Sequence, residues 1–203
     1  MKIAVMACPR PSPNALDTLA AMVAADPYAG EFESTVQFDG FAPHGTVEGL
    51  TVVEHAKQSV RSPRQRAIYN YVRCLAEHPD VIVEDDVVFT SGWVGKLRRA
   101  IEHTGGEVPI LGYNRFGVEG WHPAGEKLWG SLLMWWPKAL VGRAIRGLLL
   151  RLDDASFEAG ADEAIGETFD RIWCISPSIV QHAGDVSIIN PGHGVRRATD
   201  FQP

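Results

Sequence analysis

Short apolar runs alternate with amphipathic helical patterns along most of the chain. The β-favouring runs lie at residues 3–7, 35–38, 51–53, 81–89, 108–113, 128–136 and 171–175. Apolar residues recur at three- and four-residue spacing in most of the segments between them, which is typical of helices with one buried face. Because strand–helix–strand units favour parallel pairing, the pattern predicts an α/β domain with a mixed, mainly parallel central sheet flanked by helices.

Two of the predicted helices begin with capping signals. Ser12 before Pro13 places a hydroxyl ahead of a proline at the first helical position. The face expected to be buried in that helix comprises Leu16, Leu19, Ala20 and Val23. Ser62 with Gln65 forms a capping box at the start of the second of these helices. Residues 176–185 show no periodicity and are predicted to form an irregular tail.

Three acids interrupt the apolar segment Val81–Phe89. Glu84, Asp85 and Asp86 follow a β-favouring run, and an ionised carboxylate left unpaired in a core is costly. The carboxyl end of an inner strand avoids that cost, and α/β sheets bind ligands at this edge. Carboxylate oxygens suit Mg²⁺ or Mn²⁺ shared with substrate phosphates. The alternative interpretation is a strand that ends in a charged turn without a ligand.

Composition narrows the function classes. A chain of 203 residues with 45% apolar and 22% charged residues fits one soluble domain, and no apolar run is long enough to span a membrane. The three cysteines are widely spaced and fit a reducing cytoplasm. A net charge of −6 argues against a large nonspecific nucleic-acid surface. The sequence also lacks a phosphate-binding glycine loop, a dinucleotide fingerprint and a nucleophile elbow.

Several segments, in order, resemble glycosyltransferases of the GT-A fold, which move a sugar from a nucleotide-sugar to an acceptor hydroxyl. Glu84–Asp86 stands in the place of the family's Asp-x-Asp-type motif, and Gly130–Met134 is similar to its glycine-led donor-pocket strand. Pro177–Asp185 is similar to the Pro-Ser-Leu-x-Gln-His-x-Gly segment of some bacterial transferases and certain eukaryotic N-acetylglucosaminyltransferases. The resemblance covers residues 1 to about 190. It implies one GT-A (Rossmann-like) domain with a nucleotide-binding half at 1–90 and an acceptor-binding half at 91–203.

The resemblance also implies residue roles. Asp86 and His182 would hold Mn²⁺ or Mg²⁺, although a lone histidine is more often a surface or structural residue. Asp85 would contact the ribose or sugar of a UDP-linked donor. Strand alternation turns neighbouring side chains to opposite faces, so Asp85 and Asp86 are expected to act differently unless the strand has already turned at that point. The other residues expected at the donor are Ala7, Cys8, Arg10, Arg64, Asn70 and Glu84.

A transferase that inverts the anomeric centre needs a base for the acceptor hydroxyl. The candidates are Asp162 and Glu163, then Asp153 and Asp154. Asp162 fits equally well as a first-turn acid that stabilises its own helix. The residues expected to stack on sugar or base faces of the acceptor are Tyr113, Trp121 and Trp129.

The sequence does not identify the acceptor. Small stand-alone transferases of this kind include phage enzymes that glycosylate hydroxymethylated DNA bases, and a surface glycan is the other acceptor considered. A monomer or homodimer without a membrane span is expected. The alternative functions are a nucleotidyltransferase, a glycoside hydrolase with two separated carboxylates, and a noncatalytic module that binds a nucleotide-sugar.

Overall fold

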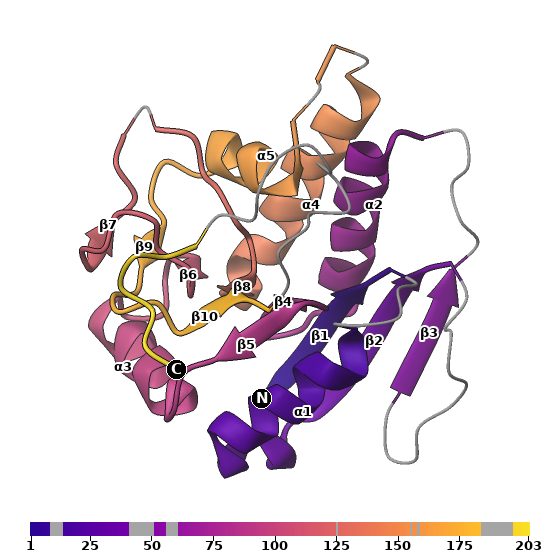
Figure 1. Ribbon diagram of the computed structural model, residues 1–203. Helices are drawn as coiled ribbons and strands as arrows, with labels where there is room; N and C mark the ends of the chain where they lie inside the picture. Colours follow the sequence, from indigo (N-terminus) through magenta and orange to yellow (C-terminus); the bar gives the residue numbers. More distant parts are fainter. Residues whose placement is uncertain are drawn as a thin grey trace.

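A mixed α/β sheet forms the centre of the computed structural model (Figure 1). The structure describes residues 1–8, 14–40, 51–55, 61–124, 126–154, 156–157, 159–183 and 197–203. Within these ranges the main sheet has the strand order β3-β2-β1-β4-β8-β6-β9-β7, and a second sheet pairs β5 with β10.

Four parallel strands make up one side of the main sheet: β3 (Thr51–His55), β2 (Glu33–Asp39), β1 (Lys2–Ala7) and β4 (Val81–Glu84). The other side contains β8 (Leu133–Trp135), β6 (Ile110–Leu111), β9 (Trp173–Cys174) and β7 (Gly120–Trp121). Strand β8 runs antiparallel to β4 and β6, and β7 runs antiparallel to β9. The predicted mixed, mainly parallel sheet is therefore confirmed.

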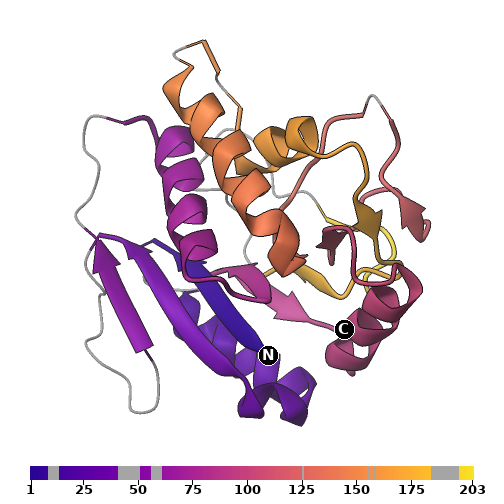
Figure 2. The ribbon, with the colours of Figure 1, turned by 180° about the vertical axis from the view of Figure 1, so that it is seen from behind.

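Helices cover both faces of this sheet. Figures 1 and 2 show α2 (Pro63–Ala76), α4 (Lys138–Asp153) and α5 (Ala161–Thr168) together on one face. The other face carries α1 (Ala15–Ala25), the short 3-10 turn η1 (Pro27–Glu31) and α3 (Trp93–His103). Strand alternation separates the two cores, since Val81 and Val83 pack towards α1 and α3 while Ile82 packs towards α2 and α4.

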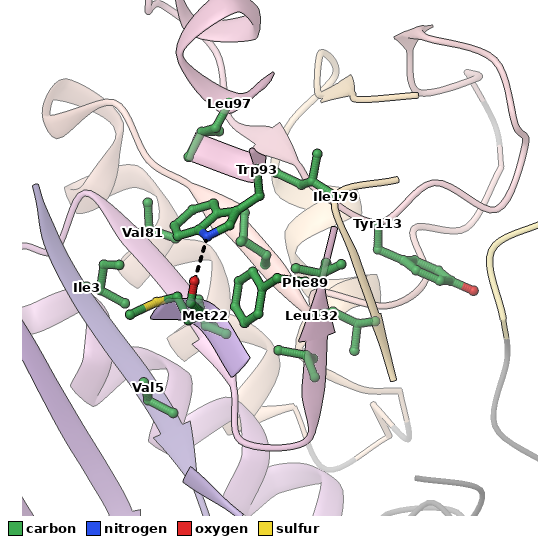
Figure 3. Packing of buried hydrophobic residues seen from close by; sticks show 14 of the residues in the cluster. Ile3, Val5, Met22, Val81, Phe89, Trp93, Leu97, Tyr113, Leu132 and Ile179 are labelled. Atoms are coloured by element: carbon green, nitrogen blue, oxygen red, sulfur yellow. Dashed lines mark hydrogen bonds between the residues drawn. The ribbon is translucent and has the colours of Figure 1, made fainter. Parts of the chain in front are cut away.

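Trp93 anchors the core beneath α1 and α3 (Figure 3). Its side chain is fully buried, and its indole N–H donates to the Met22 carbonyl at 3.2 Å. The rings of Phe89 and Phe32 lie 5.1 and 6.2 Å from it. Because Phe89 ends β5 (Val87–Phe89), this packing fixes the strand that follows the acidic turn.

One predicted helix start is confirmed and the other is wrong. Ser62 and Gln65 form the expected capping box at α2. Helix α1 begins at Ala15, with Asn14 as its cap in place of Ser12, which lies outside the described residues.

The predicted buried face of α1 is wrong in part. The fully buried residues are Ala15, Thr18 and Met22, and Leu19 is partly buried against the core, whereas Ala20 and Val23 are exposed. Helix α1 is rich in alanine, so its faces differ little in hydrophobicity. The Thr18 hydroxyl and the Val87 backbone exchange hydrogen bonds at 3.2 and 3.4 Å, and this bonding turns the Thr18 face inward.

The predicted strand 81–89 divides at its acids. Strand β4 ends at Glu84, Asp85 and Asp86 form a turn, and β5 leaves the main sheet to pair antiparallel with β10 (Val180–His182). The prediction of an irregular tail over 176–185 is therefore wrong at 180–182, because a three-residue strand is too short to show a period of its own. In this pairing His182 lies opposite Val87, next to Asp86.

Candidate active site

Three potential metal ligands meet where β4, β5 and β10 come together. One oxygen of Glu84, one of Asp86 and one ring nitrogen of His182 all lie within 4.8 Å of one another. His182 Nδ1 is 3.5 Å from Asp86 Oδ1, and the Ala183 N–H donates to the Asp86 carbonyl at 2.7 Å. Two carboxylates and an imidazole form a donor set that suits Mn²⁺, and the carboxylates also suit Mg²⁺. The residues present therefore fit a divalent cation.

Negative charge concentrates at this group. Burial, followed by the carboxylate of Asp86, raises the pKa of Glu84 to about 7, while His182 acts in the opposite direction. The Ser131 hydroxyl donates to Glu84 Oε1 at 3.2 Å and orients this carboxyl. A bound cation would neutralise the charge that burial makes unfavourable.

Asp85 and Asp86 contact different partners, although both lie in the turn after β4, where strand alternation no longer applies. Asp85 is 2% exposed, and its Oδ2 accepts a hydrogen bond from the Cys8 N–H at 2.9 Å. This bond ties the acidic turn to the residue that follows β1. Asp86 faces His182 instead, so the two acids have separate structural tasks.

Among the predicted donor residues of the first half, Asn70 ties the carboxyl end of β1 to β2. Asn70 is buried on α2, and its Nδ2 donates to the carbonyls of Ala7 and Gln37 at 3.1 and 3.2 Å. Arg64 is half-buried in the first turn of α2. Arg10 lies outside the described residues.

Asp162 sits in the first turn of α5 and holds the glycine-led segment. Its Oδ2 accepts from the Gly130 N–H at 2.9 Å, and its Oδ1 accepts from the Glu163 N–H at 3.0 Å. Burial raises the pKa of Asp162, and the bond from Gly130 opposes the rise. Gly130 has a φ of +77°, and an added Cβ would stand 2.7 Å from the Tyr113 ring, so this position requires glycine.

The other acids proposed as the base have different surroundings. Glu163 forms an ion pair with Lys127 at 2.6 Å. Asp153 is the last residue of α4, and Asp154 lies 3.9 Å from Arg151. The charge of Asp162 contributes to the raised pKa of Glu84.

The sequence matches no protein-family model and no curated protein sequence. Solved structures are similar in three dimensions. The S. aureus protein TarS, residues 1–349, gives a TM-score of 0.58 at 14% identity, over 89% of this chain and 59% of that chain. GalNAc-T7 with UDP, GalNAc and Mn²⁺ gives 0.59 at 9% identity, over 99% of this chain and 44% of that chain.

The chain has the GT-A glycosyltransferase fold. A structure of TarS 1–349 with UDP-GlcNAc gives a TM-score of 0.57 at 14% identity, over 89% of this chain and 57% of that chain. The chain thus spans between 44% and 59% of the length of these three structures.

Within this GT-A fold, the structure groups two of the three predicted acceptor aromatics. Tyr113, with its ring against Gly130, and the half-buried Trp129 line the same small pocket. Trp121 belongs to β7, the last strand in the sheet order, and is 45% exposed. The Arg171 guanidinium lies 4.0 Å from its ring centroid. Trp121 is not one of the pocket residues in the described chain.

A polar cluster that was not predicted lies at the carboxyl ends of β2 and β3. His55 Nε2 is 2.7 Å from Gln37 Oε1, and Arg66 Nε is 3.4 Å from Asp39 Oδ2. The Gln37 carbonyl also accepts from Asn70, one of the residues predicted to contact the donor. Polar residues at the ends of neighbouring predicted parallel strands were the available signal.

Proposed function

We propose that this protein is a metal-dependent glycosyltransferase that moves a sugar from a UDP-sugar to an acceptor hydroxyl. The group formed by Glu84, Asp86 and His182, at the end of an inner strand of a GT-A fold, carries this proposal. Two structures of the same fold, TarS with UDP-GlcNAc and GalNAc-T7 with UDP and Mn²⁺, support the class of donor and ion.

Asp86 and His182, with Glu84, would hold Mn²⁺ or Mg²⁺. The ion would supply positive charge to the diphosphate leaving group. Asp85, by accepting from the Cys8 N–H, keeps the residue after β1 and the acidic turn in one arrangement. The donor would contact this edge of the sheet, with Arg64 from α2 and Arg10 as proposed cationic partners.

Asp162 is the proposed base that accepts the proton of the acceptor hydroxyl. Its raised pKa makes it a stronger base than a solvated aspartate. The hydrogen bonds from Gly130 and Glu163 fix the orientation of its carboxylate. Direct attack by the deprotonated hydroxyl would invert the anomeric centre.

The proposed acceptor is a glycan, with a hydroxymethylated pyrimidine in DNA as the alternative. The net charge of −6 favours the glycan, because DNA affinity comes largely from cationic contacts with phosphates. Transfer of label from each UDP-sugar to hydroxymethylcytosine-containing DNA, or to soluble glycans, distinguishes the two acceptors.

Substitution of Asp86 tests the metal assignment. Asp86→Ala should lower UDP release from a UDP-sugar with Mn²⁺ by roughly 10³-fold, the scale of a lost transition-state charge contact, and should abolish Mn²⁺ binding measured by calorimetry. Asp170→Ala, at an exposed acid between α5 and β9, is the matched control and should behave as wild type. Wild-type turnover by Asp86→Ala would overturn the proposal. Donor binding without any turnover in the wild type would favour a noncatalytic module.

A further inference from the structure

A small pocket lies beside Trp129, the residue that precedes Gly130. It is lined by Tyr113, Asn114, Arg115, Phe116, His122 and Trp129, above Leu111 and Cys174. The pocket has an empty volume of about 180 Å³ including its open mouth. Its narrow inner part has room for about one water molecule or one hydroxyl group.

Two buried polar atoms of this pocket make no hydrogen bond with the described part of the chain. They are His122 Nε2 and Arg115 Nε. The Arg115 guanidinium is otherwise held, since its Nη2 donates to Glu126 at 2.9 Å and its Cζ lies 4.6 Å from the centroid of the Phe116 ring. Buried polar atoms left without partners are costly, so the presence of two in one pocket points to a ligand.

The chemistry of His122 defines what that ligand must offer. Burial lowers the pKa of His122, while a hydrogen bond to the Lys127 backbone opposes the fall. The ring is therefore neutral at pH 7. A neutral imidazole Nε2 either accepts or donates a hydrogen bond, and Arg115 Nε donates one. A single hydroxyl group, which has one donor and two acceptor sites, satisfies both.

The walls of the pocket suit the apolar face of a ring. Tyr113, Phe116 and Trp129 place three aromatic side chains around the two polar atoms. The Phe116 and His122 rings stand edge to face, with centroids 5.7 Å apart. Aromatic walls with a few fixed polar groups are typical of small-molecule sites, and a pyranose presents both C–H faces and hydroxyls.

Residues 129–131 link the pocket to the metal centre along the chain. Trp129 lines the pocket, and the Ser131 hydroxyl donates to Glu84. Between them is Gly130, whose N–H donates to Asp162. The proposed base therefore bonds to the residue that lies between a pocket residue and the residue that bonds to Glu84.

We propose that this pocket binds a pyranose of the acceptor, with one sugar hydroxyl held between His122 Nε2 and Arg115 Nε. The proposal rests on the transferase function argued above and names the acceptor as a hydroxyl-rich sugar. The sugar of the donor has the same chemistry, so the experiment separates the two sources.

Saturation-transfer NMR with three methyl glycosides, those of glucose, galactose and N-acetylglucosamine, tests the pocket. The wild type should bind at least one of them. His122→Phe keeps an aromatic ring, removes Nε2 and should weaken that binding at least tenfold. His122→Gln should retain most of it, because its amide group can both accept and donate a hydrogen bond. Val118→Ala, at a 72% exposed side chain in the neighbouring loop, is the control and should match the wild type.

Arg115→Lys provides a second variant should His122→Phe fail to fold, which circular dichroism would show. It keeps a cation for Glu126, removes Nε and should weaken glycoside binding similarly. Unchanged binding in a folded His122→Phe or Arg115→Lys variant would overturn the proposal, as would no glycoside binding by the wild type. Displacement of the glycoside by a UDP-sugar but not by UDP would assign the pocket to the donor and overturn the acceptor assignment.

The two proposals fail in different ways. His122→Phe should leave Mn²⁺-dependent UDP binding unchanged, because no metal ligand is altered. If Asp86→Ala were active while His122→Phe lost glycoside binding, the metal assignment would fall and the sugar pocket would stand. The reverse pattern would remove the pocket and leave the metal centre.

Discussion

The two sides of the main sheet are built in different ways. Strands β3, β2, β1 and β4 have four to seven residues each and run parallel, so the backbone ladder holds them. Strands β8, β6, β9 and β7 have two or three residues each, and their directions are mixed. Side-chain hydrogen bonds to backbone fix much of this second side, such as those of Asp162 with Gly130 and of Ser178 with Asn114.

The candidate site lies where the regular side meets the irregular one. Glu84 and Asp86 come from the end of a parallel strand, whereas His182 comes from a short strand late in the chain. The hydrogen-bonded parallel strands give the sheet an edge of fixed geometry. Side-chain contacts on the second side hold further side chains, such as that of His182, against this edge. Substitutions on the second side should therefore change activity or metal affinity more than they change the fold.

Asp162→Asn should have the largest effect among these substitutions. Asparagine still accepts from the Gly130 N–H but cannot take up a proton, so transfer should fall about 100-fold while Mn²⁺-dependent UDP binding is kept. In the wild type the rate should rise with pH through the raised pKa of Asp162, since only the ionised carboxylate is a base, and this rise should be absent in the variant. UDP release in the presence of an acceptor glycoside, followed across pH, measures both effects.

Glu163→Gln is the comparison for that prediction. Glu163 is the adjacent acid and forms its ion pair with Lys127. If the loss of rate and of the pH-dependent rise appeared in Glu163→Gln and not in Asp162→Asn, the base would be Glu163. If neither variant lost activity, Asp162 would serve only to position Gly130.

Ser131→Ala should have a smaller effect, confined to the metal centre. It removes the donor to Glu84 Oε1, so Glu84 loses its fixed orientation. Loss of a hydrogen bond to a metal ligand typically weakens binding about tenfold, and calorimetry with Mn²⁺ would measure this. Ser156→Ala removes a similar serine–carboxylate bond, to the exposed Asp154, and should leave Mn²⁺ affinity unchanged. Equal affinities of the two variants would show that Ser131 does not orient Glu84.

Much of the regular side could be predicted from the sequence. The strands around β1, β2 and β4 are long enough to show their apolar pattern, and the capping box of α2 is a local signal. The three acids stood out because they break an apolar run. The different partners of Asp85 and Asp86 did not follow from strand alternation, because both residues lie in the turn after β4. The buried face of α1 could not be predicted, because it depends on the distant contact between Thr18 and Val87.

The irregular side was harder to predict. Strands of two or three residues fall below any periodic window, so β10 was not recognised, although the resemblance had pointed to His182. Tyr113 and Trp129 were grouped as acceptor aromatics, but His122 and Arg115 were missed. His122 Nε2 and Arg115 Nε stand out because neither atom makes a hydrogen bond with the described part of the chain, and only the three-dimensional structure shows this. The cluster of Asp39 with Arg66 was missed for a similar reason, since its partners lie 27 positions apart.

The smallest expected effect concerns the end of the chain. Asp200 accepts from the hydroxyls of Ser176 and Ser178 at 2.6 and 2.9 Å, and the Ala198 N–H donates to Gln181. Residues 197–203 thus pack back on the segment that leads to His182.

Asp200→Ala removes both charge-assisted bonds and should lower stability by about 2 kcal/mol, which corresponds to a fall in Tm of roughly 4–8 °C for a chain of this length. Ser176→Ala removes one bond and should give about half of that fall. If the bonds of Asp200 with Ser176 and Ser178 also position β10, Asp200→Ala should weaken Mn²⁺ binding several-fold when it is measured at a low temperature at which the variant is fully folded. A lower Tm with wild-type Mn²⁺ affinity would show that pairing with β5 alone is enough to place His182.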